Sequence, residues 1–352
     1  MGIYLLLSIM PMVISLMFRD GNVNGDKKRP YCIICGAFLI LVLGLRSKYL
    51  GSTDTQNYYN MMDSAIKASG WKDYYDEDGV EIGFQFFVFL LSRVFHHPQW
   101  IIFISTAIYV SSMFIFCYRY SDNVRLSITM YICLEIMMFN MQGMRQSIAM
   151  SICLFAYVFA EKKKLLPFAA LIIVATLIHK TAILFSVVYL LSFIKLKPLH
   201  VFAVIIGIFV FVYFSQYLMG LANNFWGKEY TEKALSGGYV ALSIYILIFA
   251  FCMIASKYPL KENIDSMMLY VLLIGFVSYA ERYIGVRASE RISFYFTFSQ
   301  LILLPNTLEN GKIDEKDKIV VEMIVYALCV LLFMYRLRTS NLIPFRFFAG
   351  GI

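Results

Sequence analysis

Two short polar clusters interrupt an apolar sequence and contain residue types that bind or transfer charged groups. Arg145 and Gln146 stand immediately before the apolar run 147–160. If that run is a helix, its N-terminus adds a partial positive charge to the guanidinium, which predicts an anion site. His179 ends another apolar run. If that run crosses a membrane, a titratable group at its end is a candidate functional residue. The alternatives are an arginine that reaches toward lipid headgroups and a structural histidine.

A third cluster lies between residues 281 and 295 and is rich in arginine. It contains Arg282, Arg287 and Arg291, and Arg291 precedes Tyr295 by four residues, so these two side chains would share one helix face. Arginine presents a planar fork of donors that grips phosphate oxygens in pairs, which lysine cannot do. The cluster is therefore a candidate anion-binding group. Ion pairing with the two glutamates of the same segment is the alternative.

The segment that begins at Arg46 combines turn residues with groups that could contact a sugar. Gly51 allows a tight turn, and the Thr-Asp-Thr sequence centred on Asp54 supplies short hydroxyl and carboxylate groups. Tyr58 offers a flat face of the kind that stacks on sugar rings. An ordinary polar turn in which Asp54 caps the following helix accounts for the same residues. Both interpretations stay open at the level of the sequence.

Motifs of nucleotide-dependent and metal-dependent enzymes are missing from the sequence. It has no P-loop, no zinc triad and no nucleotide-binding glycine pattern. Asp76-Glu77-Asp78 matches the short acidic pattern of metal-dependent glycosyltransferases, but the whole loop is acidic, which favours a solvated loop. Cys32 and Cys35 form a single CxxC inside an apolar run, which is typical of inert membrane cysteines. We therefore expect no metal and no cofactor.

Membrane helices are the elements that must position these side chains. Of the 352 residues, 60% are hydrophobic and 15% are charged, whereas a soluble domain is about 45–50% apolar and about 25% charged. The apolar runs are continuous, which favours helices over a barrel. The net charge of +8 comes from short loops and does not indicate nucleic-acid binding. We expect an all-α, polytopic bundle, with residues 1–352 forming one transmembrane domain of about 12 helices near 2–18, 31–46, 100–118, 124–141, 144–160, 165–179, 181–194, 199–219, 239–256, 265–281, 291–308 and 319–337.

The distribution of lysines predicts the orientation of this bundle. Most lysines fall in alternate loops, which the positive-inside tendency places in the cytoplasm. The loops near 47–81 and 220–238 then lie outside, as do Arg145 and His179. A crossing at 82–95 would put successive lysine-rich loops on opposite sides, and the segment is about 14 residues long. We therefore expect a re-entrant or interfacial helix there.

In order and spacing, these residues resemble the EpsG family, which belongs with the Wzy-type O-antigen and capsular polysaccharide polymerases of bacteria. The resemblance covers nearly the whole chain. It departs from the family pattern at Ser52, where the family tends to be shorter, and at Phe345, where tyrosine is common. The motifs that carry the resemblance are Gly-Leu-Arg46, Gly51-Ser-Thr53-Asp54-Thr55-x-x-Tyr58, Glu81-Ile-Gly83-Phe84, Arg145-Gln146-x-Ile148-Ala149, His179, Arg291-x-x-x-Tyr295 and Pro344-Phe345.

The resemblance implies that a growing glycan is transferred from undecaprenyl pyrophosphate to a lipid-linked repeat unit outside the membrane. An activated lipid pyrophosphate needs no nucleotide site, and preorganised arginines would stabilise the charge that develops on it. His179 is the expected base for the acceptor hydroxyl, and Asp54 is the second candidate. The expected substrate-binding residues are Arg145, Arg287 and Arg291 at the pyrophosphate, Arg46 and Tyr58 along the glycan path, and also Gln146, Arg282 and Tyr295.

The implied partners are the lipid-linked oligosaccharide, the bilayer of the bacterial cytoplasmic membrane, a chain-length regulator and a flippase, with the active site facing the periplasm or cell exterior. Two other functions stay open. A transporter or flippase of lipid-linked sugars would also have many spans and outward-facing arginines, although repeated halves would be expected of it. A glycosyltransferase that uses a polyprenyl-phosphate sugar would add single sugars, and outer-loop carboxylates such as Asp54 and Asp63 would suit it.

Overall fold

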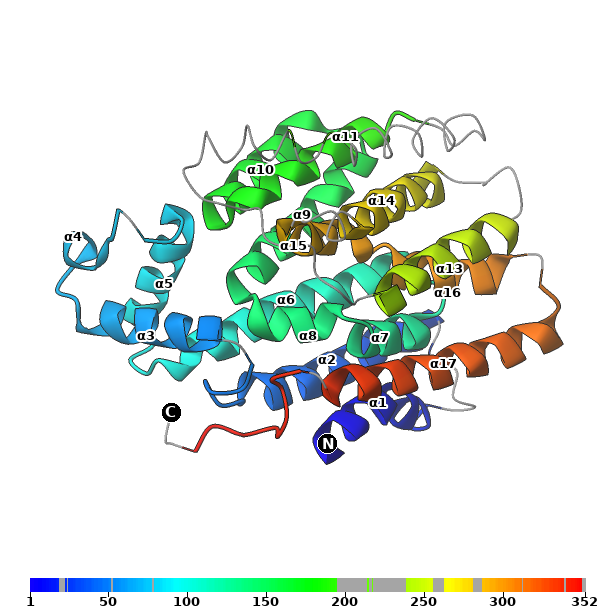
Figure 1. Cartoon of the computed structure of the whole chain (residues 1–352), viewed down its shortest axis with the longest axis horizontal. Coiled ribbons are helices and arrows are strands. Elements are labelled where there is room, and N and C mark those ends of the chain that lie inside the picture. Colours follow the sequence, from blue (N-terminus) through cyan, green and yellow to red (C-terminus); the bar gives the residue numbers. More distant parts are fainter. Residues whose placement is uncertain are drawn as a thin grey trace. The chain divides into compact units, whose positions relative to one another are not determined.

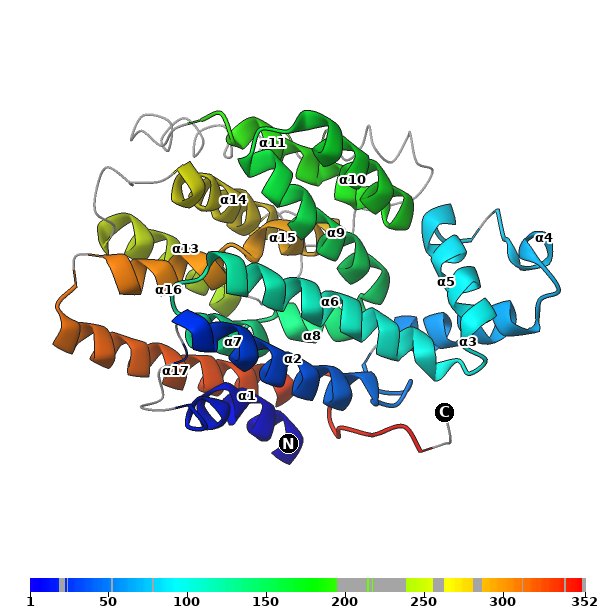
Figure 2. The same ribbon diagram turned by 180° about the vertical axis from the view of Figure 1, so that it is seen from behind.

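In the part of the chain that the computed structural model describes, the regular secondary structure is helical. The described residues are 1–18, 23, 25–51, 53–77, 79–194, 214, 217, 239–255, 263–280, 287–311, 313–338 and 340–349. Within them, the one β-type contact is an isolated antiparallel bridge between Arg46 and Phe347. The predicted all-α class is confirmed. Figures 1 and 2 show the helices from opposite sides.

The chain divides into two compact units, which we describe separately. The first consists of Met1–Ala156, Ala169–Ile183 and Asp314–Ile352, and the second of Tyr157–Phe168 and Leu184–Ile313. The first unit contains α1 (Gly2–Ser15), α2 (Lys28–Gly44), α3 (Thr53–Lys67), α4 (Trp71–Tyr74), α5 (Ile82–Val94), α6 (Gln99–Tyr120), α7 (Val124–Cys133), α8 (Ile136–Gln142) and α17 (Glu315–Arg338), together with most of α9 (Met144–Glu161) and α10 (Leu165–Ile178).

Helices α2 and α6 are antiparallel neighbours tied together at both ends (Figure 2). At one end, the Gln99 amide donates to the backbone carbonyls of Gly44 and Arg46, at 3.0 and 2.9 Å. At the other, the ammonium of Lys28 donates to the carbonyl of Ser121. The intervening segment, with α3 to α5, therefore leaves and returns at the same end of this pair. If segment 82–95 does not cross the membrane, the chain must end α2 and begin α6 on the same side, as it does here.

Helix α5 is a short apolar helix with one packed side and one exposed side. Its 13 residues span about 20 Å, less than the roughly 30 Å of a hydrocarbon core. Phe84 and Val88 are buried, whereas Phe86 and Leu90 are half exposed. Its position in a membrane stays a prediction.

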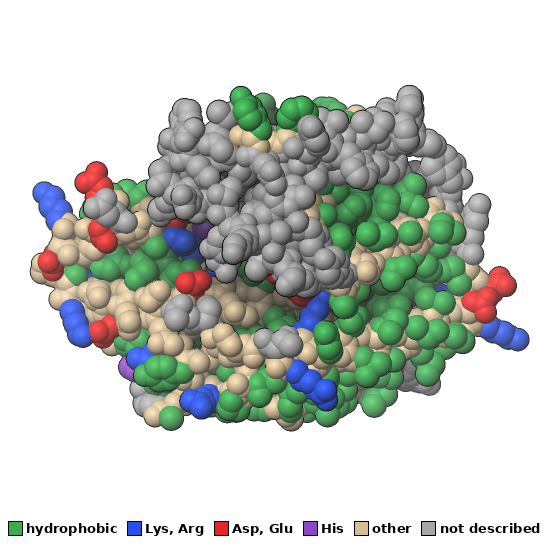
Figure 3. Space-filling view, in the orientation of Figure 1, with side chains coloured by type: hydrophobic (Ala, Val, Ile, Leu, Met, Phe, Trp, Pro, Cys, Tyr) green, Lys and Arg blue, Asp and Glu red, His purple; other side chains and the backbone are tan. Residues whose placement is uncertain are grey.

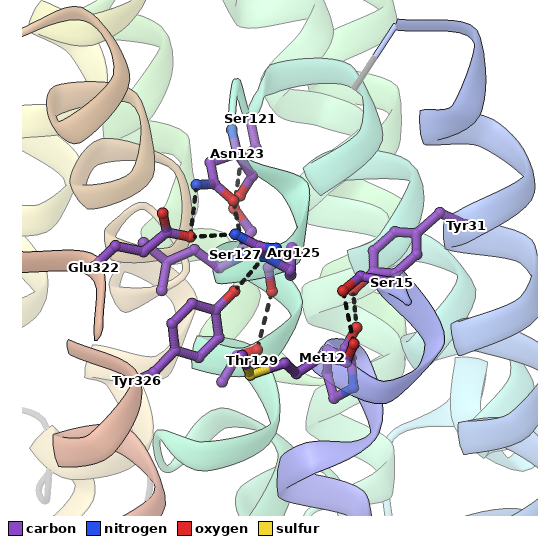
Figure 4. Close-up of polar contacts among 12 residues, drawn as sticks. Met12, Ser15, Tyr31, Ser121, Asn123, Arg125, Ser127, Thr129, Glu322 and Tyr326 are labelled. Atoms are coloured by element: carbon purple, nitrogen blue, oxygen red, sulfur yellow. Dashed lines mark hydrogen bonds and ion pairs between the residues drawn. The ribbon is translucent and has the colours of Figure 1, made fainter. Parts of the chain in front are cut away.

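The predicted span at 124–141 is a broken helix. Helices α7 and α8 meet at an angle of 51°. At the break, Glu135 pairs with Arg336 of α17 at 3.0 Å. Near the start of α7, Arg125 pairs with Glu322 of α17, also at 3.0 Å, and donates to the Tyr326 hydroxyl (Figure 4). Two ion pairs thus hold α7 parallel to α17.

Two described helices are long and apolar enough to cross a membrane, Gln99–Tyr120 and Lys316–Arg338, and the bent α7–α8 pair would make a third. Apolar side chains cover much of the face around α17 (Figure 3). Of the most apolar 18-residue stretch of this helix, only 11% is buried. A surface of that kind requires an apolar environment. Shorter apolar helices account for several other predicted spans. The total of about 12 is not confirmed and stays a prediction.

The second unit contains α11 (Val187–Leu191), α13 (Tyr239–Ala255), α14 (Asn263–Ala280), α15 (Arg287–Thr297) and α16 (Gln300–Asn310). Helices α14 and α15 pack closely, since a Cβ on Gly275 would lie 3.0 Å from Thr297 Cγ2. The predicted span at 291–308 is divided between α15 and α16. Backbone bonds of the i→i−3 type around Ser299 separate them. The predicted loop 220–238 lies outside the described residues, as does nearly all of the predicted span 199–219.

Candidate functional site

Three side chains that are far apart in the sequence meet in the first unit at one carboxylate. Glu81 directly precedes α5, Arg145 lies in the first turn of α9, and His179 directly follows α10. The Oε2 atom of Glu81 accepts a hydrogen bond from Nη1 of Arg145 at 2.6 Å. Its Oε1 atom lies 3.3 Å from Nδ1 of His179. The two residues that the sequence predicted as anion ligand and base therefore share one partner.

A close approach of α5 to α10 creates this cluster. A Cβ at Gly83 would lie 2.6 Å from the carbonyl oxygen of Leu177, closer than any side chain permits. Glycine at this position therefore lets the start of α5 rest against the last turn of α10. The chain leaves α-helical geometry after Ile178, and the backbone N–H of Lys180 donates to Oε1 of Glu81 at 3.0 Å.

The cluster is mostly buried and electrostatically matched. The side chains of Glu81, Arg145 and His179 are 11, 20 and 14% exposed. Burial alone would raise the pKa of Glu81, but its contacts with His179, the Lys180 N–H and the Arg145 guanidinium outweigh burial and lower that pKa to about 2. Glu81 is therefore ionised at neutral pH. The guanidinium keeps an unused donor, because its Nε is buried without a hydrogen-bond partner in the described structure.

The contact between His179 and Glu81 is close but not an aligned hydrogen bond. Nδ1 of His179 is buried and forms no well-aligned hydrogen bond in the part of the chain described. At 3.3 Å from a carboxylate oxygen, it is slightly beyond the range of 2.7–3.2 Å usual for an N–H···O bond. Catalytic contacts are often this long before substrate binds. The second ring nitrogen, Nε2, is directed away from the group that Nδ1 faces.

Polar side chains brace the turn that begins α9. The Ser147 hydroxyl lies 2.9 Å from Oδ1 of Asn140, and the amide of Asn140 donates to the Tyr131 hydroxyl at 3.3 Å. Gln146 is 3% exposed, so its amide is not presented to solvent. Arg145, two positions before Ser147 in the same helix, lies on a different face and contacts Glu81.

Arg46 lies in the core of the first unit. It is fully buried, and its guanidinium donates to the carbonyls of Leu43 and Met141 and to the Thr106 hydroxyl. These contacts tie the end of α2 to α6 and α8. They favour a structural role, and the glycan contact expected of Arg46 stays untested.

The C-terminal segment lies along the turn that contains Arg46. Ser47 donates its backbone N–H to the carbonyl of Arg346, and the Tyr4 hydroxyl donates to the carbonyl of Leu342. The segment thus connects the turn before α3 to α1 (Figure 1).

The other candidates of the first unit lie on α3. Asp54 is half-buried in the first turn of this helix, where a carboxylate complements the helix dipole. Tyr58 is 7% exposed, and its ring packs edge-on against Phe84 of α5, with centroids 5.2 Å apart. In this structure Tyr58 therefore joins α3 to α5, and its face is not open for stacking on a sugar.

The arginine-rich cluster belongs to the second unit and is described in part. Arg282 lies outside the described residues. Arg287 begins α15, although its side chain is not described. Arg291 is exposed, whereas Tyr295, one turn later, is 1% exposed. Their assignment as substrate ligands stays a prediction.

Glu81 was missed as a site residue by reasoning from the sequence. It was part of a family motif, but it ends a loop in which Asp73, Asp76, Glu77 and Asp78 are also acidic. The signal that could have singled it out is Gly83 two residues later, at the start of an apolar helix. In the described part of the chain, no group of three His, Cys, Asp or Glu side chains could hold a metal ion.

Comparison with known protein families identifies a match. A family model described as the EpsG family matches residues 31–347, nearly the whole chain. No curated protein and no solved structure is similar enough to match.

Proposed function

The chain belongs to the EpsG family, a family of Wzy-like polymerases, and on this premise we propose that it polymerises lipid-linked sugar repeat units at the outer face of a bacterial cytoplasmic membrane. In the proposed reaction, a growing glycan leaves undecaprenyl pyrophosphate and bonds to the free end of the next lipid-linked unit. The apolar surfaces of the described helices suit an integral membrane protein.

The observation that carries this proposal is the shared contact of Arg145 and His179 with Glu81. It brings a guanidinium and an imidazole, which are 34 positions apart in the sequence, to one partly exposed site. A partly exposed guanidinium suits a pyrophosphate oxygen, and an imidazole suits a hydroxyl.

In the proposed step, His179 and Arg145 act on the two substrates. The acceptor hydroxyl gives its proton to His179, and its oxygen bonds to the anomeric carbon of the donor. The bond from that carbon to the pyrophosphate oxygen breaks, and the electron pair leaves with the lipid pyrophosphate. Arg145 stabilises the negative charge that develops there. A positioned base contributes about 10²–10⁴-fold to such a step.

The contacts within the first unit support the proposed orientation. Lys28 of α2 lies at the same end of the α2–α6 pair as Ser121, the end that the positive-inside tendency places in the cytoplasm. Arg46 and Gln99 lie at the other end. The backbone of Met141, four residues before Arg145, is hydrogen-bonded to Arg46. Arg145 therefore begins α9 at the end that we propose to face outward.

The proposal also includes other predicted site residues, but it does not depend on them. Arg287 and Arg291 would add positive charge at the pyrophosphate, and Asp54 is the second candidate for the base. A chain-length regulator and a flippase are the proteins that we propose to act with this chain in the cell.

The experiment reconstitutes the purified chain in vesicles with lipid-linked repeat units and measures product length. We expect wild type to form long chains, and His179→Ala and Arg145→Ala to leave single units on lipid at normal protein levels. Full-length polymer from both variants would show that the site is misassigned. Products extended by one sugar would favour a single-sugar glycosyltransferase, and movement of units across the vesicle without extension would favour a transporter.

A further inference from the structure

We propose that Glu81 is a positioning residue, which holds the Nδ1 side of the His179 ring so that Nε2 faces the acceptor hydroxyl. The catalytic consequence rests on the proposed function, whereas the orientation of the ring does not. Glu81 touches neither substrate in this proposal and acts through His179 and Arg145.

The carboxylate is fixed independently of the histidine. Its Oε2 is held by Arg145 at 2.6 Å, and its Oε1 by the backbone N–H of Lys180 at 3.0 Å. Contact at Gly83 sets the distance between α5, which Glu81 directly precedes, and α10, which ends two residues before Lys180. A carboxylate held on both oxygens cannot follow a rotating ring, so the ring orients to the carboxylate.

The chemistry of the two groups selects the tautomer. A neutral imidazole has one N–H donor and one acceptor nitrogen, and an ionised carboxylate can only accept. With Nδ1 buried 3.3 Å from Oε1, the proton is favoured on Nδ1. The lone pair then lies on Nε2, the nitrogen that can take a proton from a hydroxyl.

A purely structural role for Glu81 is the competing interpretation, and the same unit contains a matched control. The ion pair between Arg125 and Glu322 is 3.0 Å long, with side chains 27 and 15% exposed (Figure 4). Its burial therefore resembles that of Arg145 and Glu81, at 20 and 11%. Glu322→Gln removes a comparable charge from a comparable pair and should not affect His179.

The first experiment measures the tautomer directly and needs no substrate. The full chain, labelled with ¹⁵N-histidine, is studied by NMR in lipid nanodiscs; it contains four histidines, and His179→Gln identifies the signal. We expect the Nδ1–H form in wild type and in Glu322→Gln, a weaker preference in Glu81→Gln, and no preference in Glu81→Ala. An Nε2–H form in wild type, or an unchanged tautomer in Glu81→Ala, would overturn the proposal.

The second experiment measures chain extension in vesicles with lipid-linked repeat units. We expect Glu81→Gln to lower kcat by about 10–100-fold, less than the 10²–10⁴-fold attributed to the base itself. Glu81→Asp should recover part of the rate, and Glu322→Gln should keep the wild-type kcat. Wild-type kcat in folded Glu81→Gln would refute the positioning role while leaving the polymerase function intact. If wild type extends no chains but shows the expected tautomer, the proposed function fails and the orientation of His179 by Glu81 stands.

Discussion

Replacing Gly83 with alanine tests the packing that assembles the site without altering any of its charged groups. The added Cβ would lie 2.6 Å from the carbonyl oxygen, 2.7 Å from the carbonyl carbon and 2.9 Å from the Cβ of Leu177. The first two are backbone atoms of α10, so no side chain can rotate away from the clash. The start of α5 must therefore move relative to α10.

The size of the movement follows from these distances. Ordinary contact begins near 3.4 Å, so relief requires a shift of about 0.8 Å. If Glu81 moves with the helix, its bond to Lys180 lengthens from 3.0 Å to about 3.8 Å, past the length of a hydrogen bond. Losing a hydrogen bond to a charged group costs about 1.5–3 kcal/mol. A misplacement of about 1 Å near a reacting group can cost about 10²-fold in rate.

We therefore expect Gly83→Ala to fold with reduced stability and to lower the rate of chain extension by about 10–100-fold. The assay measures initial rates in vesicles and thermal unfolding of the purified chain. Gly70→Ala is the control, because a Cβ at that position meets nothing within 4 Å. If Gly83→Ala matches Gly70→Ala in both rate and unfolding temperature, the approach of α5 to α10 does not set the geometry of the site.

Four further changes test other parts of the structure. Arg46→Ala should destabilise the chain by about 2–4 kcal/mol, because it leaves buried carbonyls unpaired; unchanged thermal unfolding with altered KM would instead support a glycan contact. The pKa of Glu81 is about 2 in the folded chain and 4.5 when unperturbed. The stabilisation that its ionised form provides is therefore present above pH 4.5 and is lost as pH falls toward 2. Glu81→Gln should remove this loss, which is a few kcal/mol in the free energy of unfolding measured between those two pH values. Deleting the residues from 340 onward removes the backbone bonds to the turn after α2 and should lower the unfolding temperature, whereas an unchanged temperature would show that the segment contributes nothing. Glu135→Gln and Arg336→Gln should be non-additive by about 0.5–3 kcal/mol, and strict additivity in a double-mutant cycle would mean that the pair does not couple α8 to α17.

Much of the architecture could be predicted because it depends on local properties. An excess of apolar residues in continuous runs identifies helices suited to lipid, and a charged group at the end of such a run identifies a candidate site. That reasoning selected Arg145 and His179. It also indicated that 82–95 does not carry the chain to the opposite side, which fits the return of α6 to the end of α2.

The break between α7 and α8 could not be predicted from hydrophobicity. The whole segment 124–141 is apolar enough for one span, and its 51° bend coincides with the ion pair between Glu135 and Arg336. The partner of Glu135 lies 201 positions away in the sequence. A pattern of local hydrophobicity contains no information about such a contact.

By itself, the sequence determined the helical class, the membrane character and the family, because each is a sum over neighbouring residues or ordered motifs. Only the tertiary structure distinguished the buried guanidinium of Arg46 from the partly exposed one of Arg145. It also selected Glu81 from a run of acidic residues, through contacts that cross 64 and 99 positions of sequence. A side chain's burial and partners depend on which helices pack beside it, and that packing is decided by the chain as a whole.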